Sequence, residues 1–138
     1  MTKIKNLFLI FTVFIFGSFS LMAKTQLTVY TAVEAEDLKK YAATFNEDHP
    51  DIEINWVRDS TGIITAKLLA EKNNPQADII WGLAGTSAML MKSEGMFEPY
   101  APKGLENLDS KFRDSANPPS WTGMDAWVAA DVLILLKQ

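Results

Sequence analysis

Three short loops contain the small polar residues that could bind an anion. The first is Thr31 with Ala32, the second spans residues 58–62 (RDSTG), and the third spans residues 82–87 (GLAGTS). Each loop follows a strand-like run and precedes a helical pattern, so each is expected to end at a helix N-terminus. Unpaired N–H groups and a partial positive charge at such a terminus favour bound anions. Three converging loops predict an anion site, and ordinary helix capping is the alternative for each loop.

The other reactive residue types give little support for catalysis. The sequence has no cysteine and a single histidine, His49, at the end of a predicted helix. Thiolate chemistry and a two-histidine metal motif are therefore excluded, and neither GxSxG nor the P-loop pattern GxxxxGK[ST] occurs. A metal site made of carboxylates alone stays open, although no acidic cluster has ligand spacing. We expect no catalytic residue, no bound metal and no cofactor, with a hydrolase on the same loops as the alternative.

Alternating strand and helix patterns are expected to position these loops. Strands are predicted at residues 27–30, 52–57 and 77–81, and helices at residues 33–48, 60–72 and 86–93. The apolar run at residues 77–81 (ADIIW) is typical of a strand buried on both faces, and Gly95 suits the C′ position of a helix. A fourth strand is a candidate within residues 121–136. The order β-α-β-α-β-α predicts an α/β fold with a parallel sheet, in which ligands bind at the carboxyl ends of the strands.

Several apolar side chains are expected in the core. In the second helix Ile64, Leu68 and Leu69 can face the sheet, and the strand residues Trp56 and Trp81 are also expected to be buried. Two further tryptophans, Trp121 and Trp127, flank Asp125. An aromatic ring beside a carboxylate could bind an ammonium group, and packing between two lobes is the alternative.

The N-terminal residues have the order of a secretory signal peptide. Lys3 and Lys5 precede an apolar run at residues 7–16, and small residues follow up to Ala23. This order predicts an exported, periplasmic protein whose signal peptide, residues 1–23, is cleaved after Ala23 or alternatively after Ser20. An uncleaved anchor is the other alternative. The mature chain would then hold about 115 residues, which suits one small domain.

Composition narrows the expected partners. Without cysteine there is no disulfide framework and no thiol for a lipid anchor, so an unanchored protein is expected. The formal net charge is −4, and it becomes more negative once the basic signal segment is removed. Nucleic-acid binding is therefore not expected, and we expect a monomer.

Residues 27–127 resemble the periplasmic solute-binding proteins of ABC transporters, in the cluster that contains the ferric-iron binders. The closest resemblance is to the branch for 2-aminoethylphosphonate, and the long second motif is its most specific part. The matching motifs are VYTAVEAEDLKKY (29–41), VRDSTGIITAKLLAEKNNPQADIIWG (57–82), GMFEPYAPKG (95–104) and ANPPSWTGMDAW (116–127). The resemblance implies one lobe of a type II binding protein, in which two α/β lobes close on a small ligand, with a membrane permease as partner.

The same resemblance implies which residues meet the ligand. These are Thr31, Ala32, Ser60, Thr61, Gly62, Gly82, Leu83 and Ala84. Iron-binding relatives supply a His and a Glu from these loops, and the matching positions here are Glu34 and Leu83. An oxyanion such as a phosphonate is therefore favoured, and ferric iron or another small anion is the alternative.

The last residues depart from the family's pattern. The resemblance implies that residues 24–130 are part of a first lobe and that residues 131–138 are an out-of-frame tail on a truncated gene, which would impair binding. Relatives are expected to read Phe-Asn-Thr-Val-Glu-Ala at this point. When codons for that peptide are read one base out of frame, they yield Leu-Ile-Leu-Leu-Lys-Gln, which is the sequence of residues 133–138. The coding DNA tests this expectation, because downstream sequence without a second lobe in any frame would contradict it.

Overall fold

A computed structural model of the chain describes residues 23–125. Residues 1–22 of the predicted signal segment, the predicted tail, Trp127 and most of the fourth strand candidate lie outside this range. The elements, in chain order, are β1 (Thr25–Thr31), α1 (Ala35–Asp48), β2 (Ile52–Arg58), α2 (Thr61–Ala70), β3 (Ile79–Trp81), α3 (Gly85–Ser93) and the short 3-10 helices η1 (Leu105–Asn107) and η2 (Ser110–Phe112). The predicted alternation of strands and helices is thus confirmed.

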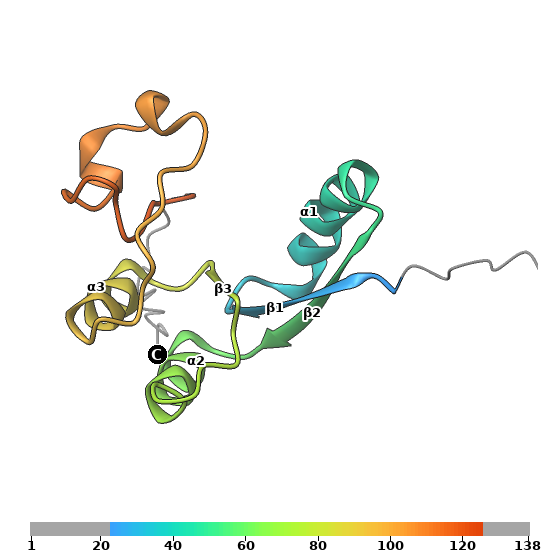
Figure 1. Ribbon diagram of the computed structural model, residues 1–138, viewed down its shortest axis with the longest axis horizontal. Helices are drawn as coiled ribbons and strands as arrows, with labels where there is room; N and C mark the ends of the chain where they lie inside the picture. Colours follow the sequence, from blue (N-terminus) through green and yellow to red (C-terminus); the bar gives the residue numbers. More distant parts are fainter. Residues whose placement is uncertain (1–22, 126–138) are drawn as a thin grey trace, which may run out of the picture.

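The strands form a parallel sheet in the order β2-β1-β3, with β1 in the centre. Figure 1 shows α1 on one side of this sheet and α2 and α3 on the other. Side chains of a strand alternate between the two faces, so Val29 and Tyr30 point in opposite directions. Both are buried, which means that β1 is covered on both sides.

The main core lies between the sheet and the helices α2 and α3. Its buried residues are Tyr30, Ile64, Leu68 and Met91, and Met91 is fully buried. Ile64 and Leu68 are four residues apart and therefore share one face of α2. Leu69, which was expected on the same face, is 37% exposed, because one further residue turns its side chain about 100° around the helix.

An aromatic cluster occupies the face of the sheet beneath α1. The ring of Trp81 lies edge-on to Tyr41 of α1 at 5.1 Å and is tilted toward Trp56 at 5.7 Å between centroids. Both tryptophans were expected in the core, but both are only half-buried and lie outside the main core cluster. The expectation that residues 77–81 form a strand buried on both faces is also wrong. Within the described residues β3 pairs with β1 alone, and Ile79 at its start is 43% exposed.

The helix ends follow the local signals in the sequence. Ser60 is the N-cap of α2, and its side-chain oxygen accepts a long hydrogen bond from Ile63 N–H at 3.5 Å. At the end of α3, Gly95 has φ +67° and its N–H bonds the Lys92 carbonyl, while Met96 N–H bonds the Met91 carbonyl. This is the Schellman pattern that a C′ glycine predicts. In the described range, none of the helices combines the length and the apolar character needed to cross a membrane.

The segment after α3 folds back onto that helix through one carboxylate. Asp114 is 6% exposed, pairs with Lys92 of α3 and accepts Ser120 N–H at 3.0 Å. The Lys92 ammonium, together with the Ser120 N–H, lowers the pKa of Asp114 to about 2. Residues 113–122 are therefore tied to α3 by a carboxylate that is ionised at neutral pH.

Candidate functional site

The three predicted loops lie at one edge of the sheet. β1 ends at Thr31, and the parallel register pairs Thr31 with Arg58 on one side and with Trp81 on the other. All three strands therefore end at the same level. Each then leads into a helix, since α1, α2 and α3 begin at residues 35, 61 and 85. The sheet thus brings together the loops that the sequence analysis singled out.

The first loop, which in the structure runs through residues 31–34 to the start of α1, is joined to the second by Thr31. This side chain is fully buried, and its hydroxyl oxygen accepts Val33 N–H at 3.0 Å. The Thr31 carbonyl accepts Asp59 N–H at 3.2 Å. The buried Thr31 therefore supports the backbone of both loops from beneath the surface of the site. Ala32 is half-buried.

The third loop packs directly against the first at Gly82. Gly82 has φ +69°, and a Cβ placed there would lie less than 3.0 Å from the Val33 side chain. Only glycine satisfies both conditions without strain. Leu83 is half-buried and packs against the main core, so its backbone, and not its side chain, is available to the site. Ala84 is the N-cap residue of α3 and offers no side-chain cap.

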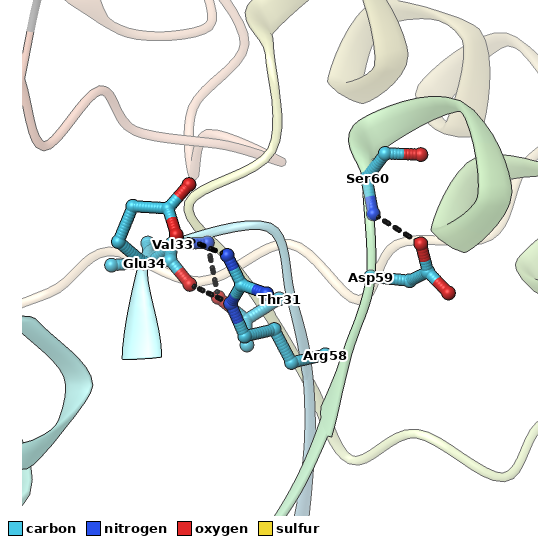
Figure 2. Close-up of polar contacts among 6 residues, drawn as sticks. All are labelled: Thr31, Val33, Glu34, Arg58, Asp59 and Ser60. Carbon is cyan, nitrogen blue, oxygen red and sulfur yellow. Dashed lines mark hydrogen bonds and ion pairs between the residues drawn. The ribbon is translucent and has the colours of Figure 1, made fainter. Parts of the chain in front are cut away.

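The second loop carries its own capping group. Asp59 Oδ1 accepts Ser60 N–H at 2.7 Å, and Ser60 in turn caps α2 (Figure 2). Thr61 is half-buried, and Gly62 is exposed with open space where a Cβ would stand. Capping, the alternative considered from sequence, is therefore present at α2. The cap occupies the N–H of Ile63, while the space around Gly62 remains open to a ligand.

Two hydroxyl groups tie the helices behind the loops together. Thr65 donates to the Thr61 carbonyl at 2.6 Å and contacts the Ser87 hydroxyl at 2.9 Å. Ser87 lies in the first turn of α3 and is 8% exposed. A partly buried polar contact thus links α2 to the first turn of α3.

The only cationic side chain in the three loops is Arg58, a residue that the sequence analysis did not single out. Its Nε donates to the Val33 carbonyl at 2.7 Å, and its terminal nitrogen forms an ion pair with Glu34 (Figure 2). Glu34 is the N-cap residue of α1, but its side chain makes no capping bond. The presence of a single arginine among two acidic loop residues was the signal that could have identified it.

Other chemistry considered from sequence lies away from this edge. His49 is at the opposite end of α1, where its ring lies tilted against Phe45 with 4.8 Å between the ring centroids. Trp121 is half-buried and borders a surface depression beside α3 together with Lys92, Lys111 and Arg113. Among residues 23–125, no group of three His, Asp or Glu side chains is arranged to hold a metal ion.

Known proteins share this arrangement of strands and helices. Residues 31–134 match the bacterial extracellular solute-binding protein family, and the chain belongs to that family. Among curated proteins it is 40% identical over 63 residues to a probable ABC transporter periplasmic-binding protein, y4fP, of Sinorhizobium fredii. It is 32% identical over 94 residues to an uncharacterized protein of Haemophilus influenzae. These matches cover 46% and 68% of this chain but only 18% and 27% of the two relatives.

Solved structures show the same architecture. The periplasmic binding protein P5PA matches with a TM-score of 0.58 and 29% identity, over 64% of this chain and 28% of its own. AfuA from Actinobacillus pleuropneumoniae, with exogenous fructose-6-phosphate bound, matches with a TM-score of 0.61 and 29% identity, over 70% of this chain and 30% of its own. The expected fold class, a parallel α/β lobe of a periplasmic binding protein, is therefore confirmed.

Proposed function

We propose that this chain is the extracytoplasmic solute-binding component of an ABC importer and that its ligand is a small oxyanion, best represented by an organophosphonate such as 2-aminoethylphosphonate. The observation that carries the proposal is the meeting of three helix-opening loops at the carboxyl edge of one parallel sheet. In such a sheet this edge is where ligands bind. Backbone N–H groups there match the oxygens of a phosphonate.

One relative supports the phosphorus-oxyanion class. AfuA is described with fructose-6-phosphate bound, and a phosphate monoester shares its tetrahedral anion with a phosphonate. The proposed contacts are the residues predicted from sequence. The backbones of Gly82, Leu83 and Ala84, the amides of Thr61 and Gly62 and the hydroxyl of Ser60 supply donors, while Thr31 and Ala32 form the floor.

Two observations favour an oxyanion over ferric iron, the alternative. Leu83, at one position where iron-binding relatives supply a metal ligand, packs against the core. Glu34, at the other position, is paired with Arg58. A ferric ion needs several hard anionic ligands, whereas the guanidinium of Arg58 would repel it.

NMR titration of the ¹⁵N-labelled chain, residues 24–138, tests this proposal. We expect 2-aminoethylphosphonate and phosphate to shift the amide signals of residues 60–62 and 82–84. We expect affinity in the millimolar range, because an anion on one open lobe stays in water, where charge interactions are weak. Ferric nitrilotriacetate, which delivers Fe³⁺, is expected to leave these amides unchanged. Iron-dependent shifts without anion-dependent shifts would overturn the oxyanion assignment.

Export and a permease partner belong to the same proposal. Residues 1–23 would act as the signal peptide, and mass spectrometry of the periplasmic product should then find Lys24 as its first residue. A product that retains Met1 in the membrane fraction would support an anchor in place of a cleaved signal. Crosslinking of the exported chain to an ABC permease would identify the transport partner.

A further inference from the structure

We infer that the Arg58–Glu34 ion pair opens around a zwitterionic ligand, with Arg58 taking its oxyanion and Glu34 taking its ammonium group. This inference rests on the proposed function and specifies which ligand the site selects. It concerns a pair that links two of the three loops, since Arg58 ends β2 and Glu34 precedes α1. Figure 2 shows the Arg58 side chain extended toward Val33 and Glu34, while Asp59 and Ser60 lie together at the start of α2.

The pair is placed where a ligand can reach it. The side chains of Arg58 and Glu34 are 36% and 77% exposed. An ion pair exposed to this degree contributes little stability, because water screens both charges. A bound ligand that offers an oxyanion and an ammonium group can therefore replace each partner with little loss of stability.

Arg58 has an anchor that does not depend on Glu34. Its Nε donates to the Val33 carbonyl at 2.7 Å, which holds the guanidinium between the first and second loops. The guanidinium is a rigid plane, so while this bond holds, its terminal nitrogens stay in place and can exchange Glu34 for a phosphonate that approaches them. A guanidinium presents two parallel N–H donors that suit such an oxyanion.

The charge balance of the loops explains why the ligand should also carry a positive charge. Residues 31–34, 58–62 and 82–86 contain the carboxylates Glu34 and Asp59 and a single cation, Arg58. Asp59 is occupied by Ser60 N–H at 2.7 Å. When Arg58 binds an oxyanion, Glu34 is left as an unpaired carboxylate beside it. A simple anion is repelled by that carboxylate, whereas an aminophosphonate pairs with it.

The test compares two ligands that differ in the amine alone, 2-aminoethylphosphonate and ethylphosphonate. Their dissociation constants are measured by NMR titration on the chain of residues 24–138 and on three variants, Arg58→Met, Glu34→Gln and Glu36→Gln. Glu36 is an exposed carboxylate in the first turn of α1, so Glu36→Gln is a control with the same change of charge. Dispersed amide spectra verify that each variant is folded, and Arg58→Lys replaces Arg58→Met if the latter is unfolded.

We expect Arg58→Met to weaken both ligands, by about fivefold. Glu34→Gln should weaken 2-aminoethylphosphonate and strengthen ethylphosphonate, each by about threefold, so that the preference changes by about tenfold. Glu36→Gln should leave the ratio of the two constants unchanged. If Glu34→Gln alters both ligands by the same factor, or if Arg58 substitution alters neither, this inference is wrong while the proposed function stands. If neither ligand shifts residues 60–62 or 82–84 in the unmodified chain, both are wrong.

Discussion

Replacing Gly82 by alanine tests the contact between the first and third loops, on which the candidate site depends. Two costs are expected from the structure. Gly82 has φ +69°, and an alanine in this left-handed region costs about 1–2 kcal/mol. The added methyl group would also lie less than 3.0 Å from Val33 Cγ2, so one of the two loops must move. Such overpacking costs about 1–3 kcal/mol, which gives a total loss of about 2–5 kcal/mol in the free energy of unfolding.

Other glycines of the same chain separate the two costs. Gly95 has φ +67° but has no atom within 4 Å of an added Cβ, so Gly95→Ala should lose only the backbone part, about 1–2 kcal/mol. Gly62 lies in α2 without positive φ and also has open space around it. Gly62→Ala is therefore expected to be neutral or to stabilise the fold by up to about 1 kcal/mol.

The measurement is urea unfolding followed by circular dichroism, with the free energy extrapolated to water. The double variant Gly82→Ala/Val33→Ala removes the Val33 methyl that would collide, so it should recover the overpacking part in a double-mutant cycle. If Gly82→Ala costs no more than Gly95→Ala, or if the cycle shows no coupling, the two loops do not touch as described.

Three further predictions concern the core and its polar contacts. Ile64→Val should lower the free energy of unfolding by about 0.5–1.5 kcal/mol, because Ile64 is 1% exposed. The control Ile63→Val, at a 56% exposed position, should change it by less than about 0.5 kcal/mol. Equal losses of the two variants in urea melts would contradict the described orientation of α2. Tyr30→Phe removes the hydrogen bond from the buried hydroxyl to Glu71 at 2.9 Å and should cost about 0.5–1.5 kcal/mol, and an unchanged urea midpoint would contradict it. The pKa of Asp114 is about 2 in the folded chain and about 3.9 when unfolded, so the unfolded state binds more protons between these values. Stability present above about pH 4 should therefore fall as the pH drops toward 2. Thermal melts should show a smaller decline for Asp114→Asn than for the unmodified chain. An equal decline would refute the contribution of Asp114 to the acid sensitivity.

The sequence alone determined the order and type of the elements. The face shared by Ile64 and Leu68, the N-cap at Ser60 and the C′ glycine at Gly95 were all predictable. Each depends on residues within a few positions of one another, because helix periodicity and capping are local properties. The parallel alternation of strands and helices then required the three loops to meet at one edge of the sheet.

Only the tertiary structure decided what these loops offer to a ligand. Thr31 and Leu83, which were predicted as ligand contacts, direct their side chains into the protein. The exposure of the start of β3 depends on which strands pair with it. The ion pair between Arg58 and Glu34 joins residues 24 positions apart. Such contacts follow from the packing of separate elements, and no local pattern in the sequence encodes which long-range partners a side chain will meet.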